Sequence, residues 1–364
     1  MNPFHGLEAR SFHSRSRPSI VVLGAGSWGT ALAAALRRSG CEVSMWTRRF
    51  ELSESIRRHR LNSRHLPGIG LPAGLRATTE LDVAIEGAQG VIVAVPSSAV
   101  RETVRAAAAL IRALPVLVAS KGVERRSGAL MTQVVHAECG EDTPAGVISG
   151  PSFADEVARG LPTRLTLAYD TLEGAPSPRA GALAIALRRA LGSIGIGLEF
   201  ESDAIGVQVA GALKNVVAVA CGMARALELG ENARAAIVSR GLVDMRRLTL
   251  ALGGDAATLW ASSGAGDLFL TAGSTSSRNT RAGMRLARGG EAHGCGELAE
   301  GLVSCEALLV LEGRLGLDLQ VARAVREVLA GQAEARSAVL RLICPEGEPA
   351  PAASHEAALL PAGS

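Results

Sequence analysis

The 364-residue chain has few aromatic residues: Phe, Trp and Tyr together make up only 3% of it. Single-stranded nucleic acids are held largely by stacking of bases on aromatic rings, so this scarcity argues against such a partner. The charge is also close to balanced, with 38 basic and 35 acidic residues and a formal net charge of +3. Nucleic-acid-binding domains carry a much larger basic excess. We therefore expect no nucleic-acid partner.

Metal-binding and disulfide patterns are missing from the sequence. Its six cysteines, at positions 41, 139, 221, 295, 305 and 344, form no C-x-x-C pair, and its seven histidines form no H-E-x-x-H motif. We therefore expect no bound metal. Cys41 and Cys221 lie inside apolar runs, which is typical of buried free thiols in a reducing compartment. This pattern predicts a cytoplasmic protein.

Long hydrophobic runs are also rare, and the one that stands out is residues 204–224, with Lys214 and Asn215 at its centre. A run of about 20 apolar residues is long enough to cross a bilayer. However, a lysine at the centre of such a helix costs about 2.5–3.5 kcal/mol on insertion scales. We therefore expect no membrane span, and predict a buried helix of a soluble protein.

On that helix, Lys214 shares its face with mostly small side chains, which leave a shallow groove beside it. They are Ala210, Gly211, Val217 and Ala218. Two interpretations stay open from this segment alone. The lysine either meets a ligand in the groove, or it buries its stem and extends its ammonium group to water.

Strand-like and helical patterns alternate along residues 19–201, and strand-like runs cover 19–23, 42–46, 90–95, 115–120, 145–150 and 163–169. This alternation predicts a Rossmann-like domain with a doubly wound, mostly parallel sheet. Residues 202–344 carry Ala, Leu and Arg at helical spacing without a convincing strand, so we predict an all-helical second domain there. Residues 1–18 and 345–364 have compositions typical of disordered tails.

The first strand-like run leads into GAGSWG, residues 24–29, and then into a helical pattern. In a dinucleotide-binding turn of this form, Gly24 permits the sharp turn, Gly26 lets the backbone approach a pyrophosphate, and Gly29 allows the helix to pack closely on the strand. The helix N-terminus then offers free N–H groups to the phosphates. A purely structural turn is the alternative.

The second strand-like run ends in WTRRF, where a chain specific for NAD usually carries an acidic residue that binds the ribose 2′-hydroxyl. This chain has Arg48 and Arg49 instead. A guanidinium group binds phosphate through two hydrogen bonds, so the pattern predicts acceptance of the 2′-phosphate of NADP(H). One arginine is enough for this contact, and the other could simply lie in water.

Taken together, the motifs resemble the NAD(P)-dependent glycerol-3-phosphate dehydrogenases of the bacterial type. The resemblance covers about residues 19–342 and rests on motifs in one order: GAGSWGTALA, VPSSAV, ASKGVE, SGPSFADEVARGLPT, GALKNVVAVACG, ENARAAIVSRGL, GAGDLFLT, SRNTRAG and AEG. It implies reduction of dihydroxyacetone phosphate to sn-glycerol 3-phosphate with NADP(H), and also NAD(H), which supplies phospholipid synthesis. We further expect a homodimer.

The resemblance also implies a set of site residues. Lys214 is the proton-transferring residue, and Lys121 and Asp267 are the other catalytic residues. The cofactor contacts, in addition to the glycine turn and the two arginines, are Ser27, Trp28, Lys121, Ala154, Arg278, Leu298 and Glu300. The substrate contacts are Lys121, Gly150, Ser152, Lys214, Asn215, Asp267, Ser277, Arg278 and Asn279.

The chemistry of these residue types agrees with the resemblance. Ketone reduction needs a hydride donor, which a nicotinamide supplies, and a proton donor for the developing alkoxide. A partly desolvated lysine near other cations has a lowered pKa, and Lys121 and Arg278 are candidates for those cations. Arg278 and Asn279 offer donors that suit a phosphate dianion. Asp267 either orients Lys214 or binds a substrate hydroxyl.

Two other functions remain open from the sequence. One is an NADP-dependent reductase of another small phosphorylated ketone or keto acid, for which the SRN segment (residues 277–279) is the discriminating feature, since an unphosphorylated substrate has no use for an anion site. The other is a regulator that senses NADP(H) without turnover. Such a regulator has no need for Lys121, Lys214, Asp267 and Arg278 together.

Overall fold

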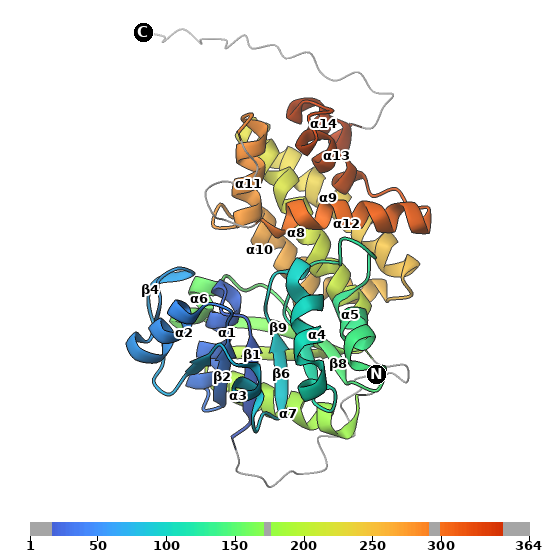
Figure 1. Ribbon diagram of the computed structural model, residues 1–364. Helices are drawn as coiled ribbons and strands as arrows, with labels where there is room; N and C mark the ends of the chain where they lie inside the picture. The colour runs from blue at the N-terminus through green and yellow to red at the C-terminus, as the bar shows by residue number, and fades with distance from the viewer. Residues whose placement is uncertain (1–16, 171–175, 291–298, 345–364) are drawn as a thin grey trace, which may run out of the picture.

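The structure is a computed structural model, and it describes residues 17–170, 176–290 and 299–344. The tails expected at either end therefore lie outside the described residues, except for Arg17 and Pro18. The described chain forms a sheet-containing part up to Glu201 and a helical part from Ala204 onwards. Figure 1 shows the two parts stacked one above the other.

Eight strands form one sheet in the order β10-β9-β8-β7-β6-β1-β2-β5 within the described residues. Their bounds are β1 (Ser19–Leu23), β2 (Glu42–Trp46), β5 (Arg76–Thr78), β6 (Gly90–Val93), β7 (Val116–Val118), β8 (Ala145–Ser149), β9 (Thr163–Tyr169) and β10 (Ile196–Glu201). Every pair is parallel except β8–β9. The prediction of a mostly parallel sheet is confirmed. Two strands, β5 and β10, were not predicted.

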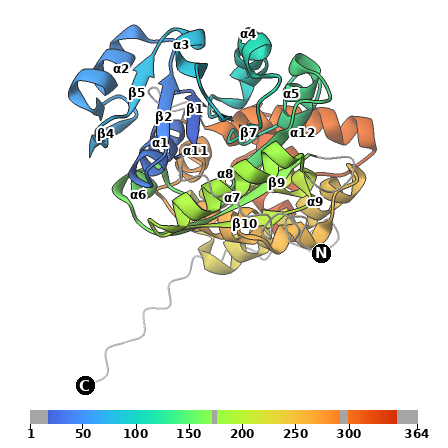
Figure 2. The same ribbon diagram turned by 90° about the horizontal axis from the view of Figure 1, so that it is seen from below.

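Both faces of the sheet are covered by helices, as Figure 2 shows. In β1, Ile20 and Val22 pack into the core under one face, whereas Val21 and Leu23 pack into the core under the other. This burial on both faces explains why the parallel strands are continuous apolar runs. The helices are α1 (Ser27–Arg38), α6 (Ala154–Arg159) and α7 (Pro178–Gly192) on one face, and α3 (Leu81–Ile85), α4 (Val100–Ile111) and α5 (Met131–Cys139) on the other.

The strand order changes direction at β1, because the chain passes from β1 to β2 on one side and later to β6 on the other. Such a switch point leaves a crevice at the carboxyl ends of the strands, where ligands of doubly wound sheets bind. A small insertion follows β2 and lies beside the carboxyl ends of the strands. It consists of α2 (Phe50–Glu54), a short π-helix (Ser55–His59) and an antiparallel hairpin of β3 (Leu61–Asn62) and β4 (Leu66–Gly70).

The helical part is built around α8 (Ala204–Ala226), the apolar helix predicted from the sequence. It packs against α9 (Gly230–Ala251), α10 (Asp267–Gly273), α11 (Arg278–Ala287), α12 (Glu300–Leu315), α13 (Gln320–Leu329) and α14 (Ala335–Ile343). Although α8 is long and apolar enough to cross a membrane, 94% of its apolar window is buried inside the protein. It is therefore the core helix of this part.

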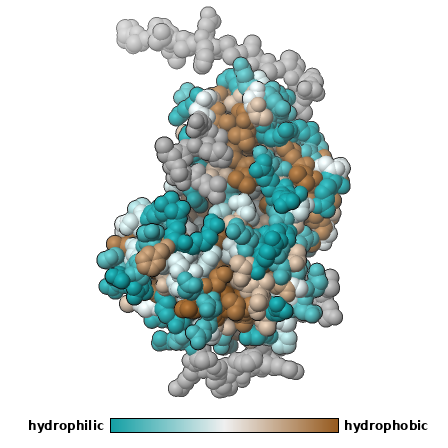
Figure 3. Space-filling view, viewed as in Figure 1, coloured by the Kyte–Doolittle hydropathy of each residue, from teal (hydrophilic) through white to brown (hydrophobic). Residues whose placement is uncertain are grey.

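Glycines bring α8 and α11 into close contact. A Cβ atom at Gly283 would lie 1.9 Å from the carbonyl oxygen of Val219, and one at Gly222 would lie 2.1 Å from that of Thr280. This approach holds residues 280–283 of α11 against residues 219–222 in the second half of α8. No strand occurs among the described residues after Glu201, in agreement with the prediction of a helical second domain. Figure 3 shows a mixed surface on one face, with apolar patches interrupted by hydrophilic side chains.

Candidate active site

One carboxylate binds two lysines where the two parts of the molecule meet. Asp267, the first residue of α10, accepts a hydrogen bond from Lys214 Nζ at 2.6 Å through Oδ1 and one from Lys121 Nζ at 2.6 Å through Oδ2. Lys214 lies in the middle of α8, and Lys121 follows β7. Lys214 Nζ also donates to Thr271 Oγ1, one turn further along α10, at 2.8 Å. Asp267 therefore fixes the positions of both ammonium groups.

The burial of this group decides its electrostatics. The Lys214 side chain is 8% exposed and that of Asp267 is 1% exposed, whereas Lys121 is 17% exposed. The pKa of Lys214 is lowered to about 7, chiefly by burial; Asp267 opposes this change, and the neighbouring Lys121 adds to it. Burial by itself would raise the pKa of Asp267. The positive charges and hydrogen bonds of Lys121 and Lys214 outweigh this effect and hold the pKa of Asp267 below its usual range. Lys214 can therefore both give and take a proton near neutral pH.

Lys121 occupies the more open side of the site. Its Nζ donates to the carbonyl oxygen of Gly150 at 3.1 Å, and Ser152 Oγ donates to the same oxygen at 2.9 Å. The stem of Lys121 lies against Gly211 of α8, where a Cβ atom would be 3.7 Å from Lys121 Cγ. Gly211 lies on the same face of α8 as Lys214, and the space beside it is occupied by the aliphatic part of the Lys121 side chain.

Asn215 and Asn279, which the resemblance assigns to substrate, are bonded to the protein itself. Asn279 Nδ2 donates to Asn215 Oδ1 at 2.8 Å, and Asn279 Oδ1 accepts from the backbone N–H of Gly301 at 2.9 Å. Ser277 is the N-cap of α11 and accepts from the N–H of Thr280. The two asparagines therefore join α8, α11 and α12, and Ser277 caps α11. Arg278, the first residue of α11, is exposed.

The glycine turn lies between β1 and α1, as the sequence predicts. Gly24 has φ +119°, and a Cβ atom there would lie 2.7 Å from the carbonyl oxygen of Ala94. At Gly29, a Cβ atom would lie 2.2 Å from the carbonyl oxygen of Gly24, so only glycine fits. Gly26 faces open space, with nothing within 4 Å of a Cβ atom. This open cradle at the N-terminus of α1 fits the pyrophosphate of a dinucleotide.

The hairpin of β3 and β4 supports this turn, and the sequence carries no motif that identifies it. Asn62 Nδ2 donates to the carbonyl oxygen of Ala25 at 2.9 Å and to Thr30 Oγ1 at 2.7 Å. Ser27 Oγ donates to the backbone oxygen of His65 at 2.8 Å. Ser27 is thus turned toward the hairpin.

His65 marks the place where the glycine turn and the helical part approach each other. Burial lowers its pKa, and the positive charges of Arg64, Arg49 and Arg278 lower it further. Arg49 and the adjacent Arg48 are exposed side chains directly after β2. The cations predicted to bind the cofactor and the substrate phosphate therefore face a common region. The Nε1 atom of Trp28 is buried here without a hydrogen-bond partner in the described residues.

Glu300, at the start of α12, is one of the remaining predicted cofactor contacts. Its Oε2 accepts from Ser97 Oγ at 2.8 Å, and burial raises the pKa of Glu300. Ser97 lies after β6 in the VPSSAV segment, so the bond joins the two parts of the molecule. Ala154 begins α6 and is partly buried. Leu298 lies outside the described residues, and among those described no group of three His, Cys, Asp or Glu residues could hold a metal.

Comparisons with known proteins agree with this geometry. A family model described as "NAD-dependent glycerol-3-phosphate dehydrogenase N-terminus" matches residues 19–175, and the corresponding C-terminus model matches residues 203–340. The chain is 40% identical over 341 residues to glycerol-3-phosphate dehydrogenase (NAD(P)+) of Stenotrophomonas maltophilia (strain R551-3), covering 92% of this chain and 97% of the relative. The Rhodospirillum rubrum enzyme of the same name is 40% identical over 332 residues, covering 89% and 91%.

A solved structure is similar along nearly the whole chain. Glycerol-3-phosphate dehydrogenase from Coxiella burnetii superimposes with a TM-score of 0.81 at 33% sequence identity, covering 90% of this chain and 99% of that one. Both halves of the fold and the order of the motifs are therefore shared with these relatives. The chain belongs to the family of NAD(P)-dependent glycerol-3-phosphate dehydrogenases.

Proposed function

We propose that this protein reduces dihydroxyacetone phosphate to sn-glycerol 3-phosphate, and catalyses the reverse oxidation, with NADPH or NADH. The observation that carries this proposal is the Lys121–Asp267–Lys214 cluster, in which one buried carboxylate bridges two lysines. The relatives named above carry this activity in their names. The product is a building block of glycerophospholipids, which places the reaction in lipid synthesis.

The cofactor fits the crevice at the carboxyl ends of β1 and β2. When bound, its nicotinamide supplies or accepts the hydride. The open space at Gly26 receives the pyrophosphate, and the exposed guanidinium groups of Arg48 and Arg49 suit a 2′-phosphate. The remaining proposed contacts are Gly24, Ser27, Trp28, Gly29, Lys121, Ala154, Arg278, Leu298 and Glu300.

Lys214 is the proposed acid and base of the reaction. With a pKa near 7 it carries a proton to the substrate oxygen during reduction and takes one during oxidation. Asp267 and Thr271 hold its Nζ in place. Lys121 is the second cation at the site, and its positive charge stabilises the negative charge that develops on the carbonyl oxygen. Asp267 is thus a positioning residue in this scheme.

Arg278 is the proposed anchor of the substrate phosphate. Arg278 is the first residue of α11 and its side chain is exposed, so the free N–H groups of the helix N-terminus lie next to it. The hydrogen bonds between Asn215, Asn279 and Gly301 fix the position of this helix start. Gly150, Ser152 and Ser277 complete the proposed substrate set.

Three further features belong to the proposal. The cofactor domain covers residues 19–201 and the helical catalytic domain covers residues 202–344. The protein works in the cytoplasm as a homodimer, and the exposed aromatic side chains of Trp260 (76%) and Phe269 (82%) in the helical part support an interface there. The five cysteines among the described residues are free, as a reducing compartment requires.

The experiment that tests the proposal is the loss of NADPH absorbance after addition of dihydroxyacetone phosphate. We expect rapid oxidation with this substrate and little with dihydroxyacetone, which lacks the phosphate that Arg278 binds. Equal rates with the two compounds would contradict a phosphate anchor. Turnover of an unrelated keto acid, without turnover of dihydroxyacetone phosphate, would favour another reductase. Cofactor binding without any turnover would favour a regulator.

A further inference from the structure

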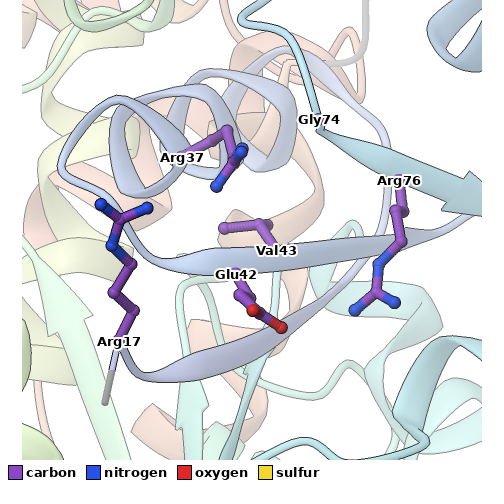
Figure 4. A pocket seen from close by; sticks show the side chains of 6 residues that line it. All are labelled: Arg17, Arg37, Glu42, Val43, Gly74 and Arg76. Carbon is purple, nitrogen blue, oxygen red and sulfur yellow. The ribbon is translucent and has the colours of Figure 1, made fainter. Parts of the chain in front are cut away.

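A basic pocket lies at the amino ends of the strands, opposite the cofactor crevice at their carboxyl ends. Its cavity volume is about 300 Å³, and it is lined by Arg17, Arg37, Glu42, Val43, Gly74 and Arg76 (Figure 4). Glu42 begins β2, Arg76 begins β5 and Arg17 precedes β1, so the pocket lies at the amino ends of three parallel strands. The glycine turn follows the carboxyl end of β1, and a five-residue strand spans about 16 Å. The pocket is therefore separate from the cofactor crevice.

One of its arginines is held rigidly by the backbone. Arg37 Nε donates to the carbonyl oxygen of Ala73 at 3.0 Å, and its Nη1 donates to that of Cys41 at 3.1 Å. Gly74 has φ +80°, and a Cβ atom there would lie only 2.5 Å from Arg37 Nη2. The guanidinium group therefore lies flat against a glycine, and its Nη2 makes no hydrogen bond within the described residues. A preorganised guanidinium loses little conformational freedom when it binds an anion.

The other charged side chains of the pocket have no hydrogen-bond or ion-pair partner in the described part of the chain. Among the residues that the structure describes, none forms a side-chain hydrogen bond or an ion pair with Arg17, Arg76 or Glu42. Figure 4 shows the guanidinium groups of Arg17 and Arg37 on one side of Glu42 and that of Arg76 on the other. Three arginines and one glutamate leave an excess of two positive charges. This excess matches the charge of a phosphate monoester dianion.

We propose that this pocket binds a small phosphate monoester that carries hydroxyl groups. Arg17, Arg37 and Arg76 donate to the phosphoryl oxygens, as guanidinium groups do in phosphate sites. Glu42 accepts a hydrogen bond from a hydroxyl group on the carbon chain of the ligand. Its carboxylate repels phosphate itself, so it favours phosphate esters that carry such a hydroxyl group. A volume of about 300 Å³ lies at the lower end of the range for small-molecule sites, so the ligand is smaller than a dinucleotide.

Ribose 5-phosphate is a suitable probe, and its binding can be measured by isothermal titration calorimetry. The test compares the wild type with the double variant Arg17→Gln/Arg76→Gln, which leaves the backbone contacts of Arg37 intact. Arg278→Gln is the control for binding in the active site. We expect the double variant to lose affinity about 10-fold or more, because two charged hydrogen-bond donors are removed. The Arg278→Gln variant should bind as the wild type does.

Two outcomes would overturn the proposal. One is a double variant that binds the probe as tightly as the wild type. The other is loss of binding in Arg278→Gln alone, since the probe would then occupy the active site. The single variants Arg17→Gln and Arg76→Gln, both at exposed positions, provide the same comparison if the double variant does not fold.

Glu42→Gln tests the selectivity for hydroxyl groups separately. Inorganic phosphate should bind this variant more tightly than the wild type, because a repulsive charge is gone. Ribose 5-phosphate should therefore lose most of its advantage over inorganic phosphate. An unchanged ratio of the two affinities would show that Glu42 does not contact the ligand, and the proposed ligand class would be wrong.

Discussion

Substituting Asp267 by Asn should move the pH dependence of catalysis in a direction that the structure specifies. In the proposed mechanism, reduction by the wild type needs protonated Lys214, whose pKa is about 7. We therefore expect kcat/KM for dihydroxyacetone phosphate to be highest below pH 7 and to fall as the pH rises through that value. The reverse oxidation needs neutral Lys214 and should rise over the same range.

The size of the change follows from the charges around Lys214. Asp267 is the negative charge that raises the pKa of Lys214, whereas burial and Lys121 lower it. An opposite charge at this distance changes a pKa by about 1–3, so its removal should lower the pKa of Lys214 to between about 4 and about 6. At pH 7 the protonated fraction then falls from about one half to between about one tenth and about one thousandth. Reduction should slow accordingly, by about 5-fold to about 500-fold.

The assay is a pH profile of kcat/KM in both directions, since this quantity reports the pKa of groups in the free enzyme. Asp244→Asn is a matched control, because Asp244 is a second buried aspartate of the helical part that instead accepts from the N–H of Val321. In this control variant, the fall of kcat/KM for reduction with rising pH should occur at the same pH as in the wild type. A basic limb that stays near pH 7 in Asp267→Asn, or moves upward, would refute the assigned role of the Lys121–Asp267–Lys214 cluster.

Much of the fold can be predicted from the sequence, because its central strands are apolar runs between strong turn signals. The runs at 19–23, 42–46 and 163–169 coincide with strands to the residue. Arg76–Thr78 was missed because three residues are too few to show a pattern. Ile196–Glu201 was missed because it lies at the edge of the sheet and carries two acidic side chains.

The site was predictable only in part. The family resemblance points to Lys121, Lys214 and Asp267 as candidates, but the sequence does not show that the carboxylate bridges both lysines. The bonds of Ser27 to His65 and of Ser97 to Glu300 join residues 38 and 203 positions apart, so only the folded chain reveals them. Asn215 and Asn279, which the resemblance assigns to substrate binding, also form a hydrogen bond with each other, and the sequence gives no sign of that bond.

Three further predictions concern the cofactor, the substrate and the helix contact. Arg48→Asp should raise the KM for NADPH about 10-fold or more and that for NADH much less, and equal losses in steady-state kinetics would refute the 2′-phosphate contact. Arg278→Ala should raise the KM for dihydroxyacetone phosphate about 10-fold to 100-fold, while the dissociation constant of NADPH, measured by fluorescence, changes less. Gly283→Ala should lower the free energy of unfolding in urea by about 1–3 kcal/mol, because the new Cβ meets the carbonyl of Val219. Gly313→Ala in α12, where a Cβ meets nothing within 4 Å, is its control and should be neutral or stabilising.

The most direct test of the central claim is the turnover of Lys214→Ala. As the proton donor, Lys214 should contribute about 10²-fold to 10⁴-fold to kcat. The variant should still fold and bind NADPH, because Asp267 keeps its ion pair with Lys121 at 2.6 Å and the glycine turn is untouched. We therefore predict a loss of kcat of that size with an almost unchanged dissociation constant for NADPH. A variant that binds NADPH and reduces dihydroxyacetone phosphate at a near-normal kcat would contradict the account.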